Sequence, residues 1–194
     1  MFRSFLGIFL MAIVIKLMDD FLDKDIDRLT DQWNLALILE RALVPYSFIL
    51  LILSLYFSFN ESVSAFAASY TIGMAGDYKE RLPTGLYSWQ EGILVLLIGA
   101  FISSIYDIIA ALANICLIQI IDDLIDLKRD IKTKNHNIVI IYGKVNSYIS
   151  AGILVLLALR FFPARTGYYL SAFFLLNLLL GFIKKKYGVV NNDY

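Results

Sequence analysis

Six apolar runs constrain this chain more than any other feature of its sequence. They occupy residues 5–18, 42–59, 63–75, 93–121, 138–159 and 167–183. A helix that crosses a bilayer needs about 20 mainly apolar residues, and most of these runs approach that length. Hydrophobic residues make up 59% of the chain, whereas about 45–50% is usual in a soluble domain. The excess is expected when the outer surface faces lipid, so we predict an all-α integral membrane bundle.

The run at 93–121 is too long for one span and is interrupted by residues that favour caps and turns. Ser103, Ser104 and Asp107 lie near its middle. We therefore predict one helix over about 90–104 and another over about 107–130, which gives about seven transmembrane helices. The helices at 62–76 and 90–104 are short and need shielding by neighbours or a thinned bilayer. Residues 1–186 are expected to form a single domain and 187–194 a polar tail.

Charge and rare residue types exclude several classes of protein. The formal net charge is zero, which gives no sign of a nucleic-acid partner. Cys116 and His136 are the single cysteine and the single histidine, so we expect neither an intrachain disulfide framework nor a zinc site. The N-terminal run resembles a signal peptide. However, Lys16, Met18 and Asp19 follow where small residues would mark a cleavage site, so we expect a retained first helix.

Basic residues predict the orientation of the helices. They are concentrated in every second connection and at the C-terminus: Lys24, Arg28, Lys79, Arg81, Lys128, Arg129, Lys132, Lys134, Lys184, Lys185 and Lys186. The intervening connections contain only Arg160 and Arg165 as basic residues. Because basic connections tend to stay in the cytoplasm, we expect them on the cytoplasmic face and the N-terminus outside.

The sequence contains an internal repeat. Residues 15–23 match residues 118–126 at an offset of 103, and the match continues from Asp27 to Asp130. In each copy a hairpin of two apolar runs follows, so each copy is predicted to be one motif helix plus a hairpin. A membrane bundle built from two similar halves is expected to place its site where the halves meet. Chance similarity between apolar stretches is the alternative.

Two aspartate clusters with the same spacing carry the chemistry. Asp20, Asp23 and Asp27 follow an i, i+3, i+7 pattern, and so do their counterparts Asp123, Asp126 and Asp130. A helix places such residues on one face, where like charges repel. A hard divalent cation removes this repulsion, and Mg²⁺ prefers carboxylate and phosphate oxygens. We therefore predict a Mg²⁺ site for a phosphate or diphosphate.

The acidic residues have two other interpretations. Charged residues at the end of a membrane helix are often only a solvated boundary, but two ends with the same register make that interpretation less economical. The segment 23–27 also resembles the start of an EF-hand calcium loop. That loop needs glycine at its sixth position and glutamate at its twelfth, whereas Arg28 and Asn34 stand there.

The two clusters resemble the signatures of the UbiA superfamily of intramembrane prenyltransferases. Residues 19–28 are similar to the first signature, N-D-x-x-D-x-x-x-D, and residues 122–133, followed by Tyr142 and Gly143, to the second, D-x-x-x-D. The resemblance implies an all-helical bundle with both motifs above a central cavity. It also implies Mg²⁺-bridged binding of a prenyl diphosphate and its ionisation. The catalytic and Mg²⁺-binding positions carry over to Asp20, Asp23, Asp27, Asp126 and Asp130, with Asp19, Asp122 and Asp123 as further metal ligands.

The chain departs from the family pattern in two respects. Asp19 replaces the leading asparagine of the first signature, and the family's first and last helices have no counterpart. The first helix normally helps to close the cavity and contact the acceptor. A second copy of this chain, in a homodimer, is one candidate for the missing wall.

Basic residues near the clusters are candidates for contacts with the diphosphate. We single out Lys79, Arg81, Lys128, Arg129 and Lys132, whose other interpretation is as topology signals. Lys16 lies one turn before the first cluster inside an apolar helix, either as a functional charge or as an ion-pair partner of Asp20. Residues 81–85 loosely resemble a loop of the family and are either a lid or a simple turn.

Three functions follow, in order of preference. The first is Mg²⁺-dependent transfer of a prenyl group from its diphosphate to an acceptor. The second is cyclisation of the prenyl diphosphate by a UbiA-type terpene synthase, which uses the same motifs and needs no acceptor pocket. The third is a non-enzymatic membrane protein that binds divalent cations.

Overall fold

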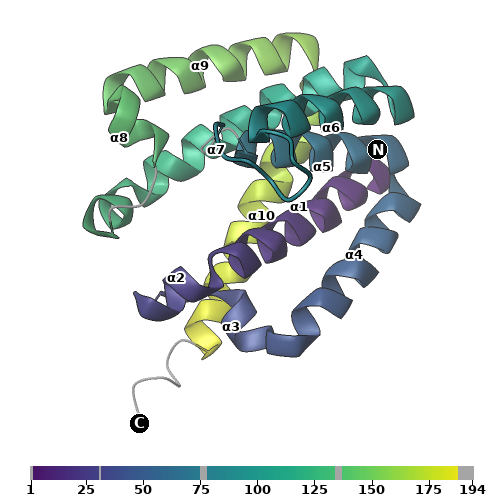
Figure 1. Cartoon of the computed structure of the whole chain (residues 1–194). Helices are drawn as coiled ribbons and strands as arrows, with labels where there is room; N and C mark the ends of the chain where they lie inside the picture. Colours follow the sequence, from purple (N-terminus) through teal and green to yellow (C-terminus); the bar gives the residue numbers. More distant parts are fainter. Residues whose placement is uncertain (1, 31, 75–77, 134–136, 188–194) are drawn as a thin grey trace.

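The structure is a computed structural model that describes residues 2–30, 32–74, 78–133 and 137–187, and this part of the chain is helical. The helices are α1 (Phe2–Leu22), α2 (Lys24–Leu29), α3 (Leu35–Leu39), the 3₁₀ turn η1 (Glu40–Ala42), α4 (Leu43–Phe57), α5 (Phe59–Met74), α6 (Ser88–Ile102), α7 (Ile105–Thr133), α8 (Ile138–Tyr142), α9 (Lys144–Phe161) and α10 (Pro163–Tyr187). Figure 1 shows α1 and α10 crossing inside the bundle, with α9 along one side. The predicted break between 90–104 and 107–130 is confirmed, since α6 ends at Ile102 and α7 begins at Ile105.

Four helical stretches of the described chain are long and apolar enough to cross a membrane. They are Leu35–Phe57, Ile105–Leu127, Lys144–Phe161 and Pro163–Lys186. The apolar helix α6 is shorter, and α1 carries several charged residues. Large apolar side chains cover the outside of the bundle; Phe101 on α6, for example, is 92% exposed. An apolar exterior on long apolar helices is typical of a membrane protein. The span assignment of α1, α5 and α6 stays a prediction.

The core lies where α1 packs against its neighbours. α1 contacts α4, α5 and α10, and α7 contacts α5, α9 and α10. The central cluster consists of buried residues from these helices: Ile8, Met11, Val14, Ala65, Ala68, Ala111, Tyr169 and Ala172. Half of these residues are small, which lets the helix backbones approach one another closely, as is usual in membrane bundles.

Gly7 on α1 is one such close approach. A Cβ atom added at Gly7 would lie 2.6 Å from the Cβ of Ser58, and the Ser54 hydroxyl donates a hydrogen bond of 2.8 Å to the Gly7 carbonyl. We expect Gly7→Ala to lower the free energy of unfolding by about 1–3 kcal/mol, the usual cost of overpacking. Thermal unfolding in detergent measures this, with Gly152→Ala as the control because its added Cβ would meet nothing within 4 Å. Equal melting temperatures for the two variants would contradict the close packing.

Local geometry recurs along the chain at the offset of 103 residues. α3 at 35–39 corresponds to α8 at 138–142. Shifted by 103, α4 falls within α9, and α5 overlaps α10 except at its first residue. Asn34, before α3, has φ −146° and ψ 133°, and Asn137, before α8, has φ −145° and ψ 124°. Both short helices end on a residue with positive φ, Glu40 at 47° and Gly143 at 87°. The motif helix of each copy is thus followed by the same turn.

Candidate functional site

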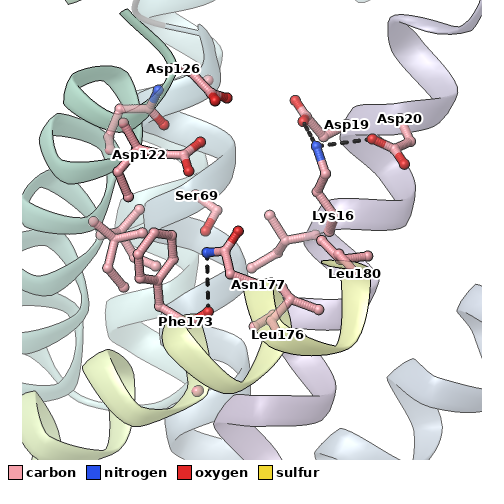
Figure 2. Close-up of a pocket in the computed structure, with 18 of the residues that line it drawn as sticks. Lys16, Asp19, Asp20, Ser69, Asp122, Asp126, Phe173, Leu176, Asn177 and Leu180 are labelled. Atoms are coloured by element: carbon pink, nitrogen blue, oxygen red, sulfur yellow. Dashed lines mark hydrogen bonds and ion pairs between the residues drawn. The ribbon is translucent and has the colours of Figure 1, made fainter. Parts of the chain in front are cut away.

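A cavity of about 510 Å³ brings the two aspartate clusters together. Figure 2 shows Asp19 and Asp20 on one side of it and Asp122 and Asp126 on the other. The acidic residues that line it are Asp19, Asp20, Asp23 and Asp27 from α1 and α2, and Asp122 and Asp126 from α7. α5 and α10 supply much of the remaining wall. Clusters about 100 residues apart in sequence therefore face one space.

The cavity changes from charged to apolar along its depth. Below the carboxylates, four polar residues lie on four different helices: Lys16, Ser69, Gln119 and Asn177. The lining residues that precede these four on the same helices lie deeper in the cavity and are mainly apolar. They include Ile8, Ala12, Ala65, Ile115, Tyr169 and Phe173. We call these two parts the polar ring and the apolar chamber. With divalent cations between the carboxylates, this arrangement would suit a ligand with an anionic head and a hydrocarbon tail.

Asp20 and Asp27 bind the segment that follows their helix through Asn34. The Asn34 amide donates to the main-chain oxygen of Asp20 at 2.7 Å and to Oδ2 of Asp27 at 2.8 Å. The Leu35 N–H donates to Oδ2 of Asp20 at 2.9 Å. Oδ1 of Asn34 in turn accepts from the Ala36 N–H at 2.6 Å, which caps α3. These bonds fix the turn between the motif helix and the next helix.

The same hydrogen bonds occur in the second copy. The Asn137 amide donates to the main-chain oxygen of Asp123 at 2.9 Å and to Oδ2 of Asp130 at 2.7 Å. The Ile138 N–H donates to Oδ2 of Asp123 at 2.7 Å, and Oδ1 of Asn137 accepts from the Val139 N–H at 2.8 Å. We call each set an asparagine bracket. The sequence pattern gave neither asparagine a role in the site, although each stands seven residues after the last aspartate of its motif.

The brackets divide the predicted metal ligands into two groups. Asp123 and Asp130 are buried and are absent from the cavity wall, whereas Asp20 and Asp27 reach the wall while also holding the first bracket. Asp19 and Asp23, with their repeat counterparts Asp122 and Asp126, line the cavity. In a helix, residues four apart share a face, so each of these pairs presents its carboxylates to the same side.

The predicted cationic residues are placed differently. Lys16 Nζ lies 3.0 Å from Oδ2 of Asp19 and 2.9 Å from Oδ1 of Asp20, at the cavity wall. Its counterpart Gln119 donates to Oδ1 of Asp123 at 3.0 Å. Lys184 near the end of α10 also lines the cavity. Sequence analysis treated Lys184 only as a topology signal.

Two of the other basic candidates, Lys79 and Arg81, are absent from the cavity wall. Lys79 and Arg81 are exposed, and they lie over the rings of Tyr78 and Tyr87, at 5.3 Å and 5.2 Å from the ring centroids. Residues 81–87 form a tight turn closed by a bridge between Arg81 and Tyr87. The side chains of three further candidates on α7 lie outside the described part of the chain: Lys128, Arg129 and Lys132.

Crowding of carboxylates changes the titration of Asp23, which follows the end of α1. Partial desolvation at the cavity raises the pKa of Asp23 above its ordinary value, and the charges of Asp19 and Asp27 raise it further. Lys16 acts in the opposite direction and only partly offsets these effects. The ionised form of Asp23 is therefore disfavoured in the folded protein as long as no cation shares the site.

This shift predicts that Asp23→Asn stabilises the protein when divalent cations are absent. A raised pKa in the folded state means that stability is lost as the pH rises through that pKa. Asparagine removes the loss, by a few tenths of a kcal/mol per like-charge neighbour. Melting temperatures in detergent with a chelator should be higher for the variant at neutral pH, and the difference should shrink as the pH falls towards about 4. A variant less stable than the wild type at neutral pH would contradict this.

The residues at the cavity fit Mg²⁺ by their chemistry. All acidic ligands offer oxygen, which Mg²⁺ prefers, and they come from two walls. Within the described ranges no group of three acidic, histidine or cysteine side chains is placed to hold an ion. Mg²⁺ is commonly bound by one or two carboxylates together with substrate phosphates, so such a preformed cage is not required. Gln32, Trp33 and Ser69 at the cavity also have donor atoms without a protein partner in the described structure, and these suit an oxygen-rich ligand.

Comparisons with known proteins give no relative from which a function could be transferred. No family model, no curated protein and no solved structure matches the chain. The residues that line the cavity therefore carry the evidence for its chemistry. Those residues are two walls of carboxylates, a polar ring that contains one lysine, and an apolar chamber below them.

Proposed function

We propose that this protein is a Mg²⁺-dependent intramembrane enzyme that ionises a prenyl diphosphate and transfers the prenyl group to an acceptor. The observation that carries the proposal is the single cavity that joins carboxylates of both motifs to an apolar chamber. With Mg²⁺ held by the carboxylates, a diphosphate has the charge that suits the acidic end of the cavity. A prenyl chain has the hydrophobicity that suits the apolar chamber. The resemblance of both motifs to the UbiA superfamily agrees with this proposal.

Each part of the cavity has a role in the proposed reaction. Asp19, Asp23, Asp122 and Asp126 would hold Mg²⁺, and the metal would supply charge neutralisation on the departing diphosphate. Lys16 is close enough to the carboxylates to exchange its contact with Asp19 for one with a phosphate oxygen. The apolar chamber keeps water away from the reactive prenyl group. Faces of aromatic rings such as Phe173 favour positive charge on that group.

The proposed architecture is a UbiA-like bundle of about seven transmembrane helices built from two similar halves. The recurrence of the asparagine bracket at an offset of 103 supports two related halves. The positive-inside rule supports a cytoplasmic cavity mouth and an external N-terminus, since Lys184, Lys185 and Lys186 end α10. We also propose that two copies of the chain form a homodimer in the bilayer.

Incubation of the purified protein with labelled prenyl diphosphates tests the proposal. The protein in detergent or nanodiscs is given Mg²⁺ or a chelator, with and without an extract of membrane lipids as the source of acceptor. Acceptor-dependent formation of a prenylated product, only with Mg²⁺, is expected. Release of inorganic diphosphate and a cyclic hydrocarbon without acceptor would replace prenyl transfer by terpene synthesis. Binding of divalent cations without any turnover would favour a non-enzymatic cation-binding protein.

A further inference from the structure

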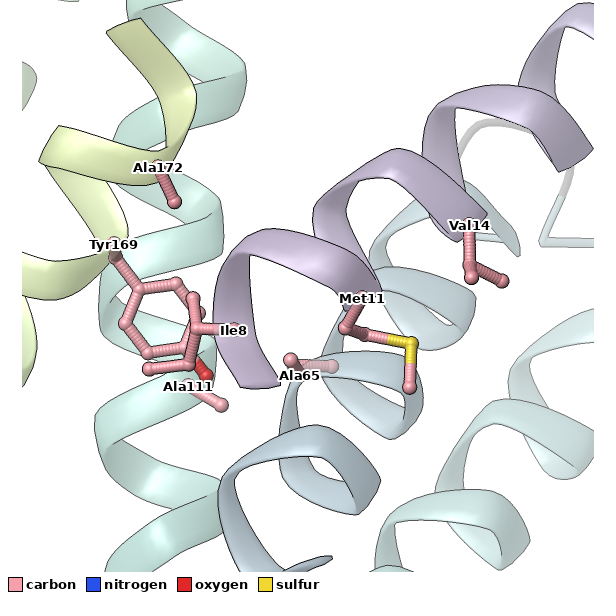
Figure 3. Packing of buried hydrophobic residues seen from close by; sticks show 8 residues of the cluster. Ile8, Met11, Val14, Ala65, Ala111, Tyr169 and Ala172 are labelled. Carbon is pink, nitrogen blue, oxygen red and sulfur yellow. The ribbon is translucent and has the colours of Figure 1, made fainter. Parts of the chain in front are cut away.

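The apolar chamber has a defined floor. Ile8 on α1 and Tyr169 on α10 both line the cavity at its apolar end. Figure 3 shows the ring of Tyr169 beside Ile8 and Ala111 in the centre of the bundle. Tyr169 is 4% exposed and Ile8 is 2% exposed. The floor is thus made of packed side chains from two helices.

Charged residues lie behind this floor. Arg165, one turn before Tyr169 on α10, forms an ion pair with Asp107 on α7. Oδ2 of Asp107 also accepts from the Ser104 hydroxyl at 2.7 Å, and the Arg165 guanidinium lies 4.6 Å from the centroid of the Tyr106 ring. A hydrocarbon chain that passed Tyr169 would have to separate partly buried charges from their partners, which is unfavourable. The floor therefore resists extension of the chamber by its packing and by its charges.

The depth of the chamber can be measured along two helices. Lys16 in the polar ring and Ile8 in the floor are eight residues apart on α1, and so are Asn177 and Tyr169 on α10. At 1.5 Å of rise per residue, both intervals span about 12 Å. Both helices give the same interval, and we take about 12 Å, measured along the helix axes, as the depth of the chamber.

Prenyl chains differ in length by steps that this depth can distinguish. An extended chain advances roughly 1.2 Å per bond, as a protein backbone does. The main chains of two, three and four isoprene units then span about 8, 13 and 18 Å between their end carbons. A chamber about 12 Å deep matches three units. A chain of two isoprene units ends short of the floor, and a chain of four units is too long to fit in extended form.

We propose that Ile8 and Tyr169 set the prenyl chain length and that the preferred substrate carries three isoprene units, as farnesyl diphosphate does. This inference rests on the proposed function, and it names the substrate of that same cavity. A mismatch at an apolar floor costs at least about tenfold in kcat/KM, since a single methylene is commonly worth that much. Ala12, one turn above Ile8 on the cavity wall, is the position at which a larger side chain would raise the floor.

Two measurements with the full chain in nanodiscs test the inference. The first compares kcat/KM for geranyl, farnesyl and geranylgeranyl diphosphate with Mg²⁺. The second compares the binding of their unreactive thiolodiphosphate analogues by thermal shift. Wild-type protein should prefer the three-unit chain by roughly tenfold, and Ala12→Phe should transfer the preference to the two-unit chain. Tyr169→Phe keeps the ring and should leave the order unchanged. Ala12→Leu replaces Ala12→Phe if the larger residue prevents folding.

The outcomes separate this inference from the proposed function. Turnover of all three diphosphates at similar efficiency, or an unchanged order in the Ala12 variants, overturns the length rule and leaves the enzyme proposal standing. Length-dependent binding of the analogues without any turnover supports the length rule and contradicts the enzyme proposal. Absence of both binding and turnover overturns the two together.

Discussion

Replacing either Asp23 or Asp126 with asparagine is expected to lower Mg²⁺-dependent turnover of a prenyl diphosphate at least 100-fold. Both side chains line the cavity, one from each motif. Each substitution removes a charged oxygen ligand from one wall while keeping the shape of the side chain. A metal ion that neutralises a leaving group contributes several kcal/mol, and a loss of about 3 kcal/mol corresponds to roughly 100-fold in rate. Initial rates at saturating Mg²⁺ measure the effect.

A matched control exists on the same segment as Asp23. Asp25 is exposed on α2 and does not line the cavity. Asp25→Asn changes the net charge by the same amount and should leave turnover within about twofold, because exposed substitutions away from a site have small effects. Melting temperatures of all three variants verify that they fold. Turnover in Asp126→Asn equal to that of Asp25→Asn would exclude the second motif from the reaction.

The second large effect is expected from the asparagine brackets, as a loss of stability. Asn137→Leu keeps the approximate volume of the side chain but removes both amide hydrogen bonds, to Asp123 and Asp130, and the cap on Val139. Hydrogen bonds to charged groups contribute about 1.5–3 kcal/mol each, and a buried carboxylate that loses its donor is costly. We expect a loss of about 3–5 kcal/mol in the free energy of unfolding. This corresponds to a drop of roughly 10 °C or more in melting temperature.

The stability loss of Asn137→Leu can be compared with the losses of two further variants. Asn34→Leu should have an effect of similar size, because Asn34 makes the same contacts in the first copy. Asn146→Leu removes a hydrogen bond of 2.9 Å to the Tyr142 carbonyl at an exposed position and should cost no more than about 0.5 kcal/mol. If Asn137→Leu were as mild as Asn146→Leu, the bracket would not stabilise the fold.

The sequence was sufficient to predict that the protein is helical and that the two aspartate motifs lie close together. Apolar runs with capping serines predicted the break between α6 and α7, because local residue preferences control helix ends. The offset of 103 predicted that Asp23 and Asp126 occupy equivalent positions, and both line the cavity. These features depend on the spacing of residues along a helix. That spacing can be read from the sequence without knowing the path of the connections between helices.

The sequence was not sufficient to separate cavity carboxylates from bracket carboxylates. The i, i+3, i+7 pattern treats Asp123, Asp126 and Asp130 alike, yet Asp123 and Asp130 bind Asn137, which lies up to 14 residues further along the chain. Such a bond depends on the path of the connection, and spacing on one helix does not contain that information. Lys184 was missed for a similar reason. Its place at the cavity depends on the crossing of α10 over α1, and a run of lysines in a tail is otherwise typical of a topology signal.

The brackets and the helix contacts together determine how the mouth of the cavity can vary. Each bracket makes one motif helix and its following turn a stiff unit. α5 and α10 each pack against both α1 and α7 and so connect the two units. A shift of α5 or α10 would move one row of carboxylates relative to the other without breaking any bond inside a unit. The gap between the carboxylates of the first motif and those of the second is therefore governed by α5 and α10, two helices that contain neither motif.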